Sequence, residues 1–135
     1  AVRHVLERAD LVLYLVNAAE APEDSPHIDA ELQVLALTAK PVIVLLNQLG
    51  APRPPAEEAA EIERWRRHLA SRPVVREVLA LDAFARCWVQ EEGLLAAVAA
   101  ALPPEPAERV QAFGRLRAAW AARARATFEA SMRVL

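Results

Sequence analysis

Two asparagines stand where apolar runs of this 135-residue sequence stop. Asn17 closes the run 11–17, and Asn47 follows the run 42–46. An asparagine amide offers both a hydrogen-bond donor and an acceptor, so it can pair with the edge of a purine base. In parallel sheets, ligands bind outside the carboxyl ends of the strands. The two positions therefore predict a nucleotide site, with a turn cap at Asn47 as the alternative.

The elements that must position these residues alternate along the chain. Apolar runs typical of buried parallel strands occupy 11–17, 42–46 and 74–81. Helical spacing of apolar residues occupies 1–8, 28–38, 56–70, 91–102 and 107–135, with Ile28, Leu32, Leu35 and Leu37 facing inward in the second of these. Residues 21–26 are expected to form a loop. Such alternation requires right-handed crossovers, so the predicted fold class is α/β with a parallel sheet and an appended C-terminal helix.

The bulk composition limits the classes of function. The chain is 55% hydrophobic and 25% charged, which is typical of a globular domain. A net charge of −2 provides no general attraction to nucleic acid, and we expect no nucleic-acid partner. One cysteine excludes an internal disulfide and suits a reducing compartment. We expect a cytoplasmic protein, because no apolar run is long enough to span a bilayer.

Other candidate chemistries are weaker. The three histidines and Cys87 lack the spacing of metal ligands. A buried structural role for Cys87 is favoured over a reactive thiolate. Each tryptophan falls on an apolar stripe, which predicts packing in the core rather than stacking on bases. We therefore expect no catalytic residue and no metal ligand in the chain.

Three segments carry a family resemblance. The segments 9–17, 40–48 and 79–83 resemble the second half of a small bacterial GTPase of the Era/TrmE type. In that family an Ala-Asp pair precedes an apolar strand, the Lys-Pro-Val-Ile strand ends in Asn-Lys-x-Asp, and a later strand ends in Ser-Ala. The resemblance covers residues 1–102 and implies a P-loop-NTPase-like three-layer sandwich.

The base-recognition motif departs from the family pattern. Asn47 matches the motif asparagine, Gln48 stands in place of the lysine that stacks beside the base, and Gly50 replaces the aspartate that pairs with guanine. Each lost charge-assisted hydrogen bond removes about 1.5–3 kcal/mol of selectivity for guanine. The resemblance places Asp82 and Ala83 opposite: the Ala83 amide could reach a base oxygen, and Asp82 could replace the missing carboxylate.

The long final helix and the segment 81–88 together resemble a group of Era-like GTPases that have a helical C-terminal extension. Members of that group have a similar base motif, Asn-Gln-x-Gly, so the departure could be a trait of the group. We interpret residues 1–103 as the C-terminal half of a GTPase-like domain and 104–135 as the start of an extension. The sequence has no Gly-x-x-x-x-Gly-Lys-[Ser/Thr] loop. We therefore expect GTP or GDP with magnesium only in a longer protein, and no GTP hydrolysis by this chain alone.

The resemblance implies a regulatory protein that binds guanine nucleotides. A non-catalytic interaction module with a decayed nucleotide site is the alternative, and a flavodoxin-like receiver is a third. Helix 107–135 is basic and amphipathic, so it is a candidate contact for a protein partner or an anionic membrane, unless it packs on the sheet domain. If the chain is a fragment, we expect a long apolar sheet edge through which it associates.

Overall fold

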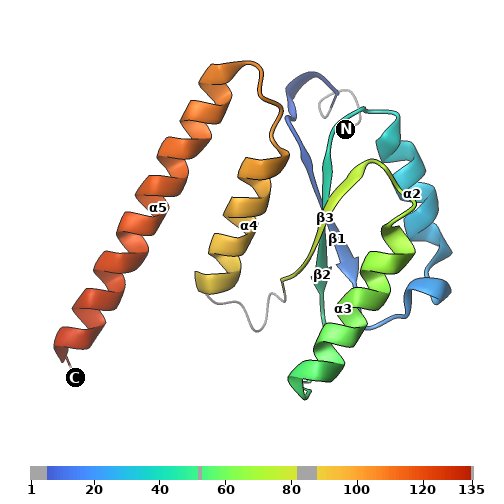
Figure 1. Ribbon diagram of the computed structural model, residues 1–135, viewed down its shortest axis with the longest axis horizontal. Helices are drawn as coiled ribbons and strands as arrows, with labels where there is room; N and C mark the ends of the chain where they lie inside the picture. Colours follow the sequence, from blue (N-terminus) through green and yellow to red (C-terminus); the bar gives the residue numbers. More distant parts are fainter. Residues whose placement is uncertain (1–5, 52, 82–87, 135) are drawn as a thin grey trace. The chain divides into compact units, whose positions relative to one another are not determined.

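The computed structural model describes residues 6–51, 53–81 and 88–134 (Figure 1). The chain forms two compact units, Ala1–Arg86 and Cys87–Leu135. The first contains β1 (Val12–Asn17), the short 3₁₀ helix η1 (Pro22–Asp24), α2 (Pro26–Ala36), β2 (Val42–Asn47), α3 (Pro55–Leu69) and β3 (Val75–Ala80). The second contains α4 (Trp88–Ala101) and α5 (Ala107–Val134). The predicted α/β class and long final helix are confirmed.

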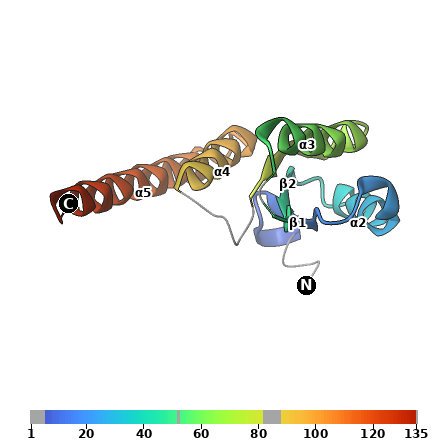
Figure 2. The same cartoon turned by 90° about the horizontal axis from the view of Figure 1, so that it is seen from below.

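The sheet of the first unit is parallel throughout, with the strand order β1-β2-β3. The three predicted strands agree with the observed strands to within one residue at each end. Because the order in space follows the order in sequence, two right-handed crossovers place their helices on the same face of the sheet. Figures 1 and 2 show α2 and α3 together on that face.

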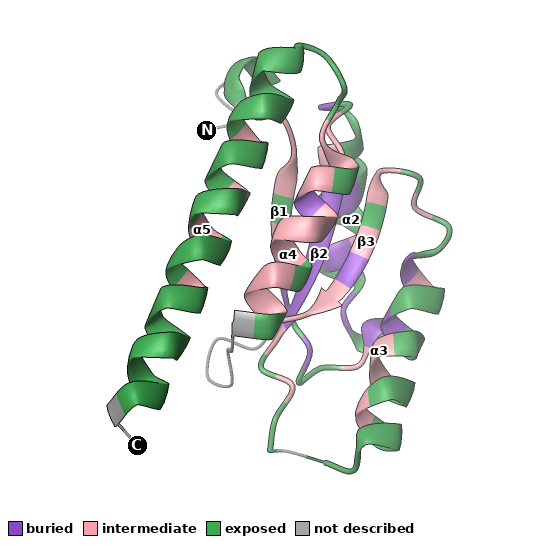
Figure 3. Cartoon of the chain, turned by 60° about the vertical axis from the view of Figure 1, so that its left-hand side comes forward, coloured by how far each residue is buried: buried purple, intermediate pink, exposed green. Residues whose placement is uncertain are grey.

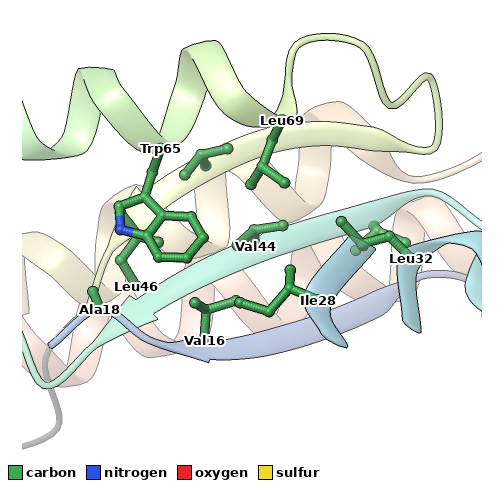
Figure 4. Packing of buried hydrophobic residues seen from close by; sticks show 10 residues of the cluster. Val16, Ala18, Ile28, Leu32, Val44, Leu46, Trp65 and Leu69 are labelled. Carbon is green, nitrogen blue, oxygen red and sulfur yellow. The ribbon is translucent and has the colours of Figure 1, made fainter. Parts of the chain in front are cut away.

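The core of the first unit lies between this face and the two helices (Figure 4). Ile28 and Leu32 from α2 and Trp65 and Leu69 from α3 are almost fully buried against Val44 of β2. Burying a side chain of this size stabilises the fold by about 1.5–3 kcal/mol. The prediction that Trp65 belongs to the core is therefore confirmed.

The ends of α2 differ from the prediction. The loop was expected to extend to residue 26, but the helix already begins at Pro26. Proline fits the first turn of a helix, because an N–H group there would have no partner within the helix. It ends at Ala36, so the inward position expected for Leu37 is wrong: this side chain is 82% exposed. The Thr38 hydroxyl donates a 2.7 Å hydrogen bond to the Leu35 carbonyl at this end.

A polar cluster joins α2 to α3. The Arg72 guanidinium lies 2.8 Å from one oxygen of the Asp29 carboxylate, and His68 Nε2 lies 3.3 Å from the other. Both side chains come from α3 or the turn after it, whereas Asp29 lies in the first turn of α2. The cluster therefore ties the two crossover helices together at a partly shielded position, where ion pairs are screened less than at the surface.

The second unit is a helical hairpin of α4 and α5. Arg117 of α5 lies 2.5 Å from Glu92 of α4, and Trp120 Nε1 donates a 3.2 Å hydrogen bond to Glu91. The half-buried residues of α5 recur every three or four positions, as expected for one helix face. In the part of the chain that is described, no helix is both long and apolar enough to cross a membrane.

Tyr14 of β1 links the sheet to α2. Its hydroxyl donates a hydrogen bond to the Glu31 carboxylate. Burial raises the pKa of Tyr14 well above its usual range, and the hydrogen bond to Glu31 and that group's negative charge raise it further. Because the neutral form is favoured in the folded chain, this contribution to stability is present below pH 10 and is lost as the pH rises beyond that value.

Tyr14 is the only tyrosine, so tyrosinate absorbance reports on it alone. We expect the folded chain to titrate clearly above pH 10. The Glu31→Gln variant should titrate at a lower pH than the parent chain, because the charge is lost while burial remains. Equal midpoints in the two proteins, with the fold intact by circular dichroism, would contradict the Tyr14–Glu31 contact.

Candidate functional site

The two asparagines singled out in the sequence are neighbours in the sheet. Asn17 and Asn47 are register partners at the carboxyl ends of β1 and β2. The Ala18 amide, which follows Asn17, donates a 2.7 Å hydrogen bond to the Asn47 carbonyl. The structure therefore places both side chains at one edge of the parallel sheet, as predicted from the ends of the two apolar runs.

Asn17 closes the turn after β1. Its Oδ1 accepts a 3.1 Å hydrogen bond from the Ala19 amide, a contact that asparagine commonly makes two residues ahead. This bond uses the side-chain oxygen and leaves the two Nδ2 donors out of the turn. Asn17 is exposed, so these donors lie at the surface beside Asn47.

The loop after β2 has an unusual backbone. Gln48 has φ +57° and Gly50 has φ +86°, both in the left-handed region. Leu49, between them, packs against the core, whereas Gln48 and Gly50 are exposed. A Cβ atom added at Gly50 would meet no atom within 4 Å. The backbone conformation, and not the available space, therefore favours glycine at this position.

Arg53 supports this loop and was not recognised in the sequence. Its amide donates a 3.0 Å hydrogen bond to Glu58 of α3, and its guanidinium lies 3.5 Å from the Leu49 carbonyl. These contacts join the loop to the first turn of α3. The pair Glu57-Glu58 at the start of the predicted helix was the available signal, since acidic residues there attract backbone amides and cations.

Asp82 and Ala83, the predicted opposite side of the site, lie outside the described residues. The chain leading to them is placed: the Leu81 amide donates a 3.0 Å hydrogen bond to the Leu46 carbonyl. The backbone after β3 therefore leaves the sheet at the same carboxyl edge as Asn47. Cys87 and the side chain of Trp88 also lie outside the described part of the chain.

The described ranges contain no group of three or more histidine, cysteine or acidic side chains arranged to hold a metal ion. The amide side chains and backbone groups at the sheet edge suit neutral hydrogen bonding to a ligand. No protein family, curated protein or solved structure matches this chain. The geometry of the carboxyl edge is therefore the basis for a proposed function.

The loop backbone leads to a paired test of stability. Gly50→Ala should destabilise the first unit by about 1 kcal/mol, because an L-residue is strained at φ +86°. Ala39→Gly should stabilise it by about the same amount, because Ala39 already occupies the left-handed region at φ +53°. Urea denaturation followed by circular dichroism measures both, and shifts of the same sign would contradict the assigned backbone.

Proposed function

We propose that this chain supplies the base-recognition half of a guanine-nucleotide site in a regulatory protein of the GTPase type. The supporting observation is the register pairing of Asn17 with Asn47 at the carboxyl edge, followed by the left-handed loop at Gln48 and Gly50. Such an edge is where nucleotides bind in parallel α/β folds. In this proposal the first unit is part of a P-loop-NTPase-like sandwich.

Each residue has a separate role in the proposal. The Asn47 amide makes the main polar contact with the base, and the exposed Gln48 side chain lies beside the ring. Gly50 supplies no carboxylate, so discrimination against adenine is weak unless Asp82 provides one. The family resemblance implies that the Ala83 amide would pair with a base oxygen.

Phosphates and magnesium require a glycine-rich loop, a lysine and a metal ligand, and these 135 residues contain no such loop. GTP or GDP with magnesium would therefore need a phosphate-binding half from outside these residues. If such a half is present, GTP hydrolysis is a further part of the proposal.

The second candidate is a non-catalytic interaction module. The exposed apolar side chains Leu116, Phe128 and Met132 on α5 favour it, because exposed apolar surface can mark the contact site of a partner. The arginines of α5 would suit either an acidic protein partner or an anionic membrane. Under this candidate, the loop 47–50 no longer binds a base.

Titration of the 135-residue chain with guanosine, GDP and adenosine, followed by amide chemical shifts, separates the two candidates. We expect weak binding that perturbs Asn47 and Gln48. GDP should bind no more tightly than guanosine, because the phosphates have no loop to hold them. Asn47→Ala should weaken binding about tenfold, the value of one or two lost hydrogen bonds.

The matched control is Gln33→Ala, which removes an exposed amide from α2 and should leave guanosine binding unchanged. The absence of shifts at Asn47 and Gln48 at millimolar guanosine would overturn the proposal. It would favour the interaction module.

Restoring the family carboxylate tests the same site by gain of function. Gly50→Asp should raise the preference for guanosine over adenosine by tenfold or more, because a carboxylate accepts two charge-assisted hydrogen bonds from guanine. The neutral control Gly50→Asn has similar size and tolerates positive φ, but it offers one acceptor. Equal preference in the two variants would show that position 50 does not face the base.

A further inference from the structure

The two edge strands of the sheet, β1 and β3, differ in the hydrogen bonding of their outward backbone groups. At the β3 edge, the outward N–H of Val78 donates a 3.0 Å hydrogen bond to the Glu77 carboxylate. The outward carbonyl of the same residue accepts a 3.3 Å bond from Arg66 of α3. Charged side chains on an edge strand are a common way to prevent pairing with another chain. At the centre of the β3 edge, the backbone groups of Val78 are therefore already hydrogen-bonded and do not invite pairing with another strand.

The β1 edge has no such protection in the described residues. The amides of Val12 and Ala18 donate to carbonyls on the β2 side, at 2.9 and 2.7 Å, so even-numbered residues bond to β2. In a parallel ladder the alternate residues, Leu13 and Leu15, then direct their N–H and C=O groups outward. Within the described chain, no hydrogen bond meets these four groups.

The side chains of β1 also lack charge and proline. The strand Val12–Asn17 contains four aliphatic residues, one tyrosine and one asparagine. Leu13 and Leu15 are 42% and 64% exposed, on the opposite face of the sheet from α2 and α3. On the helical face, Tyr14 and Val34 line an apolar hollow of about 390 Å³ beside the edge. Figure 3 shows this contrast between exposed parts of β1 and the buried β2.

We propose that β1 pairs in an antiparallel arrangement with β1 of a second copy of this chain. A two-fold axis beside Tyr14 sets Leu13 opposite Leu15 of the second copy, and Leu15 opposite its Leu13. These are the residues whose N–H and C=O groups point outward, so they can exchange hydrogen bonds in the pattern of an antiparallel ladder. The result is a continuous six-stranded sheet.

The second copy is the favoured occupant because the strand is complementary to itself. The centre of β1 reads Leu-Tyr-Leu, which is the same in both directions, so a two-fold axis places leucine against leucine on one face. No like charges on the strand meet across the axis. The two tyrosines fall on the helical face, at a position where paired side chains come closest. This inference concerns the 135-residue chain by itself, because a phosphate-binding half that extended the sheet at β1 would take the place of the second copy.

Sedimentation of the full 135-residue chain over a range of concentrations tests the proposal. We expect a monomer–dimer equilibrium that Leu15→Lys shifts to monomer, because it places two ammonium groups beside the axis. Val89→Lys is the control: this valine on α4 is 59% exposed, and its substitution should leave association unchanged. A wild-type chain that stays monomeric, or equal loss of the dimer in both variants, would overturn the proposal.

Amide hydrogen exchange locates the contact residue by residue. In the dimer the amides of Leu13 and Leu15 should exchange at least tenfold more slowly than in the Leu15→Lys monomer. The amide of Val16, which bonds within the sheet, should stay protected in both and so report that the variant is folded. A dimer in which the Leu13 amide exchanges as fast as in the monomer would place the interface elsewhere and refute the pairing of β1.

Discussion

Burial of β2 on both faces is the constraint on which the first unit depends. Val42, Ile43, Val44, Leu45 and Leu46 are all at most 5% exposed. A strand without a polar side must lie in the middle of its sheet, with neighbours on both edges. The neighbours β1 and β3 join it in parallel, and the crossover helices that parallel pairing requires cover one face with Trp65 and Leu32.

The same constraint creates the candidate site. Because parallel strands end at the same edge, the first polar residues after each apolar run must gather there. Asn17 and Asn47 are side by side for this reason, and not through any direct attraction between them. The loop at Gln48 and Gly50 then turns the chain back toward α3 through left-handed backbone, with Arg53 holding it in place. A polar edge of this kind can offer hydrogen bonds to a planar ligand without a deep cleft.

The edge strands of the sheet are subject to a different constraint from its central strand. The burial of β2 does not determine whether the outward backbone groups of β1 and β3 find hydrogen-bond partners, and the two strands differ in this respect. Glu77 and Arg66 satisfy the outer groups of Val78, whereas the outer backbone groups of Leu13 and Leu15 have no partner among the described residues, and their side chains are exposed. An uncharged edge of this kind is an unstable surface in water unless another strand covers it. The pairing of β1 proposed above would remove this exposed edge.

The sequence by itself determined the strands, most helix positions and the placement of Asn47, because apolar runs and their periodicity report burial directly. It failed at the end of α2 and at Arg53. Leu37 matched the apolar spacing of α2, but the helix ends one residue earlier, and Thr38 and Ala39 turn the chain away. Arg53 lay in a proline-rich connection without any periodic signal, and only folding brought it to Glu58 and Leu49. The pairing of Asn17 with Asn47, the left-handed loop and the unequal edges were decided by tertiary structure, since register and crossover geometry arise only when the strands assemble.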